Sequence, residues 1–541
     1  MTEQTNQKKS GFYDSIAQPL RPGVRLSIIE GSLSTVMGTF TGGAFLIGYA
    51  LVLGADDFEI GLLSSLPLLA NLIQIIGSLI IAKAGSRKKV CALYLFLHRM
   101  TWTCIALLPL IVFHDRLADA RIWIFLFLLT AASVCASITG IAWTAWIADL
   151  IPKGVRGRFF SRRNMFAQVV GMIAAVGAGQ FIDIWQSRHT TARMQSNGFM
   201  ILFTIGIVFG LASIILIRKM HEPAIAPSQD TAFFKQLREP FQDKNFRIFI
   251  IFSMAWGFST GIVGPFFSVY MINTLQIPFS MITLFGVAAG LASIAGFKLW
   301  GAMIDKVGAR PLALLCGIGG SFVPFFWIFA TPDQYLMIWI SNIVSGLFFA
   351  GIGLASTGLM MNLAPERNNA VYFAVFAAVT GLSGALAPVA GGALGDFFRG
   401  RTLYEGFVIF SDIRLLFLAS TLMRLLSLLI IRFIKTSETV SVTQMFGRIS
   451  KLQAYLPLYQ IQTITTTGLS AAENIMNGMA KGVISVEAKI DHLLDRGFDL
   501  SKAVIFKARL LDQHLDDGLA QHEARLEKLI DRIIALFKRK G

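Results

Sequence analysis

The chain has 541 residues, of which 54% are hydrophobic and only 15% are charged. This is more apolar side chain than a water-soluble protein can bury, so the composition excludes a soluble globular protein and predicts that lipid surrounds most of the chain. The formal net charge of +16 comes largely from basic residues in alternate short loops. That distribution sets membrane topology and argues against a nucleic-acid partner.

The first 24 residues are polar and are predicted to form a cytoplasmic N-terminal segment. The apolar run that follows lacks a small-residue cleavage pattern, so it is expected to remain as the first spanning helix. Apolar runs long enough to cross a ~30 Å hydrocarbon core recur as far as residue 434. We predict twelve spans, at 25–52, 58–82, 90–113, 121–148, 160–184, 198–218, 246–273, 280–304, 311–330, 335–362, 371–397 and 411–434.

Basic residues concentrate in the loops after the second, fourth and sixth spans. The positive-inside rule places these loops in the cytoplasm, and an even number of spans then puts both termini there. We therefore expect a multi-pass protein of the cytoplasmic (inner) membrane. The four cysteines lie inside apolar runs without paired spacing, so neither a disulfide framework nor a metal site is predicted.

The chain divides near its middle at a polar stretch, residues 219–245, which we interpret as a cytoplasmic linker. It separates an N-terminal six-helix bundle (25–218) from a C-terminal six-helix bundle (246–434). The two halves repeat. An offset of 213 residues aligns Pro152, Gly179 and Asp183 with Pro365, Gly392 and Asp396, and similar offsets align other loop and span residues.

A charged turn follows the eighth span, with the pattern G-x3-D-K-x-G-x-R at Gly301, Asp305, Lys306, Gly308 and Arg310. A carboxylate at a helix end, beside cations on a glycine turn, can bridge reversibly to a neighbouring helix terminus. With this motif and the parallel repeat of six spans, the chain resembles the major facilitator superfamily of secondary transporters. The resemblance implies an all-α integral membrane protein of two six-helix bundles, in which this turn clamps one state of an alternating-access cycle.

The first-half copy of the turn is degraded. Gly85, Arg87 and Lys88 keep the turn and its cations, but alanine stands where the acid belongs. Asp149, at the end of the fourth span, is a candidate substitute acid for Arg87, Lys88 or Arg156. The alternative is that Asp149 only caps the turn that follows it.

An ionisable side chain inside a membrane span costs insertion free energy, so each one present is a candidate for a functional or structural role. Glu30 lies in the first span, a helix that the resemblance implies lines the central cavity. Desolvation favours the protonated form of a carboxylate, which suits a proton carrier. The alternative for Glu30 is a structural bond to another helix or to the cytoplasmic gate.

His98 and Arg99 are adjacent in the third span, so their side chains point about 100° apart and are not expected to face one cavity. They have either a functional or an interhelical role. Lys298 in the eighth span either snorkels to the membrane interface or faces the cavity, where it would favour an anionic substrate.

Uncharged candidates for solute binding lie on helices that the resemblance implies line the cavity. They are Trp143 on the fourth span, Ser259 and Thr260 on the seventh, and Asn342 on the tenth. The alternative for the tryptophans is interfacial anchoring, which suits Trp146 better than Trp143. The chain has no Gly-x4-Gly-Lys-Ser/Thr phosphate loop and no His-Glu-x-x-His pair, so ATP-driven pumping, zincin-type enzyme chemistry, cofactors and metals are not predicted.

Residues 435–541 are predicted to form a cytoplasmic helical extension. Apolar residues from Leu515 to Leu536 alternate in steps of three and four, which indicates a partner-binding or self-association helix. Packing on the rest of the tail or on the membrane is the alternative. The sequence therefore predicts proton-coupled or facilitative transport of a small solute. The second hypothesis is a transporter-derived sensor or scaffold that acts through its tail.

Overall fold

The computed structural model describes residues 21–73, 80–81, 83–112, 120–151, 156–222, 238–332, 334–365, 369–398, 402–404, 410–411 and 413–435. The predicted tail helix lies outside these residues. The proposed linker is covered only at its two ends, so the bounds of the linker and of the tail stay predictions.

All the regular elements described in the first half of the chain are helices. Its elements are α1 (Arg21–Phe40), α2 (Gly43–Val52), α3 (Asp57–Ala70), η2 (Asn71–Ile73), α5 (Arg87–Leu107), α6 (Pro109–Val112), α7 (Arg121–Leu150), α8 (Arg156–Arg188) and α9 (Ala192–Lys219).

The second half repeats this arrangement and adds a short antiparallel strand pair. Its elements are α11 (Glu239–Gln242), α12 (Lys244–Gly261), α13 (Phe266–Val269), η5 (Tyr270–Thr274), α14 (Phe279–Val307), α15 (Ala309–Ser321), α16 (Val323–Ile328), α17 (Leu336–Leu363), α18 (Asn369–Phe398), β1 (Thr402–Tyr404), β2 (Phe410–Ser411), α19 (Ile413–Ile430) and η6 (Ile431–Phe433).

Eleven helical stretches in the described residues are long and apolar enough to cross a membrane. They match all the predicted spans except the second, which begins with α3 and η2 and then enters residues 74–79, outside the described ranges. The prediction of an all-α integral membrane protein is confirmed.

Local sequence signals begin several of these helices. The Asp56 carboxylate accepts the Glu59 N–H at 2.7 Å while the Glu59 side chain accepts the Asp56 N–H, which makes a capping box at the start of α3. Asp243 caps α12 through the N–H groups of Asn245 and Phe246. These caps satisfy backbone donors that a helix leaves unpaired at its first turn.

The first span of each half is broken at the same repeated place. α1 ends at Phe40 and α2 begins at Gly43, while α12 ends at Gly261 and α13 begins at Phe266. The sequence offset of 222 that relates Gly42 to Gly264 therefore relates two helix breaks. Broken spanning helices are tolerated where the exposed backbone lies inside the protein or lines a cavity.

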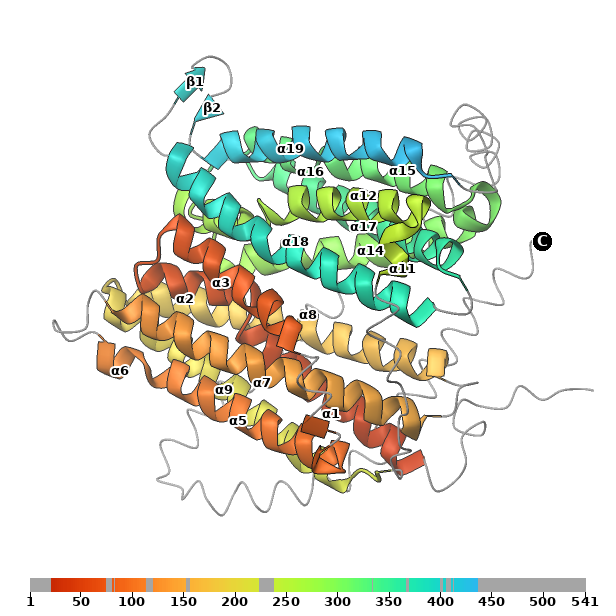
Figure 1. Ribbon diagram of the computed structural model, residues 1–541. Helices are drawn as coiled ribbons and strands as arrows, with labels where there is room; N and C mark the ends of the chain where they lie inside the picture. The colour runs from red at the N-terminus through yellow and green to blue at the C-terminus, as the bar shows by residue number, and fades with distance from the viewer. Residues whose placement is uncertain are drawn as a thin grey trace, which may run out of the picture. The chain divides into compact units, whose positions relative to one another are not determined.

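Helices α1 to α9 form one bundle and α11 to α19 a second, seen on the lower and upper sides of Figure 1. Within the first, α5 packs on α7 and α1 packs on α8 and α9; within the second, α14 packs on α17 and α12 on α18. The bundles meet through two equivalent pairs, α3 with α18 and α8 with α14. The fifth spanning helix of each half thus packs on the second spanning helix of the other.

Candidate functional site

The two bundles are held together at one end, which we call the closed end: there α3 and α14 begin and α8 and α18 end. Gly179 of α8 lies on the backbone of Phe279 and Ser280, so that an added Cβ would come within 2.8 Å of the Phe279 carbonyl oxygen. One turn later, the Asp183 carboxylate accepts the N–H groups of Phe279 at 2.6 Å and Ser280 at 2.9 Å. An acid at a helix N-terminus is favourable because the helix dipole is positive there.

The other pair of helices repeats this contact. Gly392 of α18, the repeat partner of Gly179, lies on the backbone of Asp57 and Phe58 at the start of α3. The absence of side chains at both glycines lets the helices approach closely. The closed end is therefore sealed by two matching contacts between the bundles.

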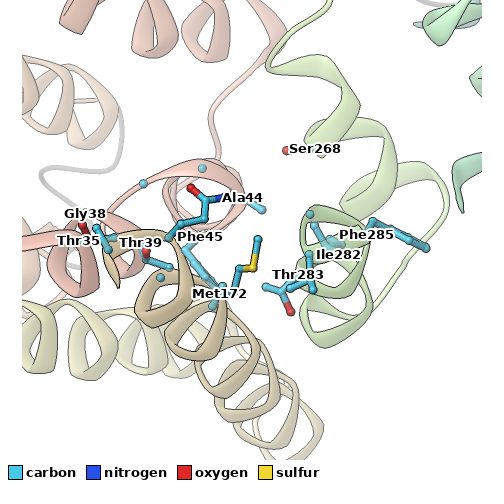
Figure 2. A pocket seen from close by; sticks show the side chains of 18 of the residues that line it. Thr35, Gly38, Thr39, Ala44, Phe45, Met172, Ser268, Ile282, Thr283 and Phe285 are labelled. Carbon is cyan, nitrogen blue, oxygen red and sulfur yellow. The ribbon is translucent and has the colours of Figure 1, made fainter. Parts of the chain in front are cut away.

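A cavity of about 750 Å³ lies between the bundles. Its walls come from α1, α2 and α8 of the first bundle and from α13, η5, α14 and α17 of the second. Figure 2 shows Met172 between residues such as Phe45 on one side and Thr283 on the other. The volume falls within the range of sites that enclose a small molecule.

Helix α8 supplies one continuous face of the cavity. Its lining residues follow the helical period and change character along the helix, from polar to small and apolar. They are Arg163, Asn164, Ala167, Gln168, Gly171, Met172 and Ala175. Among the described lining residues, Arg163 is the one ionisable side chain.

Arg163 is held against Glu30 of α1. Its Nη2 donates to a Glu30 carboxylate oxygen at 3.3 Å and its Nε donates to the Ser27 carbonyl oxygen at 3.3 Å. The other Glu30 oxygen accepts the Ser34 hydroxyl at 2.8 Å. The Glu30 side chain is 5% exposed and that of Arg163 is 18% exposed. Glu30 was among the predicted site residues, whereas Arg163 was not.

Two further residues fix the guanidinium. Its carbon lies 4.3 Å from the centroid of the Trp143 ring, a cation–π contact. Gly31 leaves the space that the group occupies, because a Cβ there would come within 2.7 Å of it. The structure thus brings Trp143 and Glu30 together around Arg163, while the Trp143 indole N–H is buried without a partner among the described residues.

His98 and Arg99 lie away from the cavity, between α5 and its neighbours. Although adjacent, the two side chains meet, with Arg99 Nη1 2.7 Å from His98 Nδ1, and Trp102 donates to His98 Nε2 at 3.2 Å. Arg99 packs against Gly210 of α9. Glu30 is within electrostatic range of Arg99 and Cys91, so three groups on α5 and α8 face its carboxylate.

Of the uncharged residues predicted to bind the solute on α12 and α17, one lines the cavity and two do not. Asn342 lines the cavity, and its amide donates to the Ile338 carbonyl oxygen at 2.9 Å. Ser259 is buried and bonds to the Trp256 carbonyl oxygen, as does Thr260. Neither residue belongs to the described lining of this cavity, so a role for them in solute binding stays a prediction.

Lys298 and Trp146 have different surroundings. Lys298 is exposed and does not belong to the described lining of the cavity. Trp146 is fully buried and donates to the His221 carbonyl oxygen at 3.0 Å. The expectation that Trp146 anchors at the membrane interface was therefore wrong, because a partner on the chain following α9 satisfies its N–H.

The repeated charged turn lies at the opposite end from the closed end; we call it the basic end. Gly308 ends α14 with a φ of +86° and Gly85 has a φ of +63°, conformations that favour glycine. Arg310 donates to the Arg432 carbonyl oxygen at 2.8 Å, at the end of the last helix of its half. A Cβ at Gly301 would meet nothing within 4 Å. The side chains of Asp305, Lys306, Asp149 and Arg156 lie outside the described residues.

The first-half turn contains an acid that sequence analysis missed. Glu222, just after α9, accepts the Ser86 hydroxyl at 2.7 Å and the Lys88 backbone N–H at 2.9 Å. In return, Lys88 Nζ donates to the Met220 carbonyl oxygen at 2.7 Å. An acid thus caps the start of α5 while a cation caps the end of α9, and Arg87 also has a contact partner.

Comparison with known proteins identifies this arrangement. The family model of the Major Facilitator Superfamily matches residues 31–297 and 249–472. Multidrug resistance protein 2 of Bacillus subtilis (strain 168) is 24% identical over 289 residues, which are 53% of this chain and 70% of that protein. The cis,cis-muconate transport protein of Acinetobacter baylyi is 30% identical over 155 residues, 26% of this chain and 38% of that protein.

Solved structures share the fold at low sequence identity. The nucleoside transporter NupG has a TM-score of 0.57 and 13% identity, covering 77% of this chain and 99% of that one. The D-xylose-proton symporter has a TM-score of 0.58 and 14% identity, over 77% and 98%. An inward-facing bacterial homologue of the iron transporter ferroportin has a TM-score of 0.57 and 13% identity, over 76% and 98%. At these identities the likeness concerns the fold alone.

Proposed function

The chain belongs to the major facilitator superfamily, and on this premise we propose that it carries a small solute across the cytoplasmic membrane by alternating access, coupled to protons through Glu30. The observation that supports this most directly is a cavity between two bundles, sealed at one end, with a buried carboxylate–guanidinium pair at its wall. Solved relatives of the same fold include a D-xylose-proton symporter and nucleoside transporters.

The basic end faces the cytoplasm in this proposal, because the loops rich in Lys and Arg lie there. The structure then corresponds to the inward-facing state, since the bundles meet at the closed end. In the outward-facing state, the paired contacts of Gly179 and Gly392 separate and the repeated turns at the basic end come together. The gate at the basic end consists of Gly85, Arg87, Lys88, Asp149, Arg156, Gly301, Asp305, Lys306, Gly308 and Arg310.

Proton coupling acts through the Glu30–Arg163 pair. The two hydrogen bonds that hold the Arg163 guanidinium, Nη2 to Glu30 and Nε to Ser27, are each 3.3 Å long, slightly longer than a typical N–H···O bond. A proton on Glu30 cancels its negative charge and weakens its hold on Arg163. The protonation state of Glu30 thereby decides how strongly Arg163 attracts a solute in the cavity.

Glu30→Gln tests this coupling, because Gln keeps the shape of the side chain but cannot take up and release the proton as a carboxylate does. Purified protein in liposomes that contain a pH-sensitive dye is offered pools of anionic, neutral and cationic metabolites. We expect one pool to move protons with the wild type and none to do so with Glu30→Gln, while exchange of the same solute continues. Glu59→Gln is the matched control, since Glu59 caps α3 outside the described cavity lining. Proton movement that persists in Glu30→Gln excludes Glu30 as the carrier.

A further inference from the structure

We propose that Arg163 forms a carboxylate subsite and that the solute is a small organic monoanion with an apolar body. The inference rests on the proposed transport function and names its substrate class. It starts from one fact of the cavity: among the described lining residues, a single guanidinium provides all the formal charge.

Arg163 has donors left over for a ligand. A guanidinium carries five N–H groups, and the structure uses one on Nε, to Ser27, and one on Nη2, to Glu30. Nη1 has no hydrogen-bond partner among the described residues, and the side chain is 18% exposed where it lines the cavity. The remaining N–H groups are therefore available on the cavity side.

The group is also held in place before a ligand arrives. The Trp143 ring supports one face of the guanidinium, the Ser27 carbonyl holds Nε, and Gly31 leaves room behind it. A planar guanidinium fixed in this way matches the two oxygens of a carboxylate, which an ammonium does not. Fixing the donor in advance lowers the entropy lost on binding.

The expected charge of the ligand follows from the charged side chains at the cavity wall. Arg163 is the one cation among the described lining residues, and Glu30 is its partner. Once Glu30 takes a proton, one positive charge remains unpaired, which one carboxylate neutralises. A second negative charge on the ligand would have no counterpart in this part of the cavity.

The shape of the ligand follows from the polarity gradient. Near Arg163 the wall that α8 supplies is polar, with Asn164 and Gln168, whereas toward the closed end α8 supplies only small or apolar side chains. Phe45 and Phe285 add aromatic rings to the lining around Met172, with the hydroxyl groups of Thr39 and Thr283 beside them (Figure 2). The rise from Arg163 to Met172 along α8 is nine residues, or about 14 Å. A body of one or two rings, with its carboxylate toward Arg163, fits this length.

Binding of matched ring compounds tests the assignment in detergent, without any proton gradient. The probes are radiolabelled benzoate, phenylacetate and 2-naphthoate, with benzamide as a neutral compound of the same shape as benzoate. We expect the wild type to bind at least one carboxylate and to bind benzoate at least about tenfold more tightly than benzamide, the ratio that a charge-assisted hydrogen bond provides. Arg163→Gln should remove this preference, and Arg163→Lys should restore it in part.

Two further variants show whether a loss of binding comes from misfolding or from a general change of charge and not from the loss of the subsite. The double variant Glu30→Gln with Arg163→Gln leaves no unpaired charge and should also lose carboxylate preference. Arg188→Gln, at the exposed end of the same helix, should bind like the wild type. Equal binding of benzoate by wild type and Arg163→Gln, or failure of all three carboxylates to bind the wild type, overturns the assignment.

The two proposals fail separately. If the wild type moves protons with a neutral solute and binds no carboxylate, the anion assignment fails while transport and coupling stand. If carboxylates bind through Arg163 but Glu30→Gln still accumulates them with protons, the role of Glu30 fails while the subsite stands.

Discussion

The position of the Arg163 guanidinium depends on Gly31 having no Cβ atom. An added Cβ would come within 2.7 Å of three guanidinium atoms. Because these atoms form the free end of a flexible side chain, the expected response is a displaced Arg163 in an otherwise intact bundle. Glycine at residue 31 therefore acts on the subsite more than on the fold.

Gly31→Ala is predicted to weaken benzoate binding roughly tenfold, which corresponds to about 1.4 kcal/mol, while the thermal unfolding midpoint in detergent changes little. Binding and thermal unfolding of the same purified sample measure the two quantities. Gly177→Ala on α8 is the control, since a Cβ there would meet nothing within 4 Å. Benzoate binding by Gly31→Ala at the wild-type level would show that Gly31 does not position the guanidinium.

Glu30 could be predicted from the sequence, but its partner Arg163 could not. A lone carboxylate in an apolar span is conspicuous, whereas Arg163 stands in a row of basic residues at a predicted span edge, where the positive-inside rule assigns cations to loops. The signal that was available is the helical period of polar and small residues from Arg163 to Ala175. For Ser259 and Thr260 the sequence could not specify an orientation, because α12 is apolar around most of its circumference and its pattern does not reveal which face meets the cavity.

At the scale of helices, Asp183 links α8 of one bundle to the start of α14 in the other through two hydrogen bonds. Bonds to a charged group contribute about 1.5–3 kcal/mol each. Asp183→Asn removes the charge, so we expect the population open at the closed end to rise roughly tenfold. The distance between spin labels on exposed Ser187 and Thr274, in a cysteine-free background, measures this opening.

The matched control for this prediction is Asp243→Asn. Asp243 caps α12 through two similar hydrogen bonds, but both lie within one bundle. Its loss should lower the thermal stability without changing the distance distribution. An unchanged distribution in Asp183→Asn as well would show that this cap does not hold the bundles together.

The repeat in the sequence anticipated part of the contacts between helices. Lys88 and Arg310 lie in the corresponding turns of the two halves, three residues after Gly85 and two after Gly308, and each donates to a carbonyl oxygen at the end of the last helix of its half. The acid of the first-half turn could not be anticipated in the same way. Glu222 comes from a segment more than one hundred residues away in sequence, so only the packing of α9 against α5 brings it to the turn.

At the scale of the whole molecule, eleven of the twelve predicted spans are matched by long apolar helices in the described residues, because span length and hydropathy follow directly from the thickness of the bilayer. The tail has no such constraint. We predict that a chain ending at residue 439 moves protons with its solute in liposomes at a rate within about twofold of the full chain, because the cavity and its charged pair lie wholly before that residue. The same liposome assay with both chains measures the rate.

A sensor or scaffold that acts through its tail makes a different prediction. In that case the shortened chain loses the cellular phenotype of the full chain, even when its flux in liposomes is normal. Loss of flux itself would show that the transport cycle depends on residues beyond 439.

The pairing of Glu30 with Arg163 also has an electrical consequence. In the empty protein the charges of this pair cancel, and in the loaded protein a proton on Glu30 and a monoanion on Arg163 cancel as well. The described cavity then carries no net charge when either the empty or the loaded protein changes between its inward-facing and outward-facing states. A membrane potential does work only on net charge that moves across the membrane. We therefore expect accumulation of the anion to follow the pH difference across the membrane and to be unaffected by a valinomycin-imposed voltage.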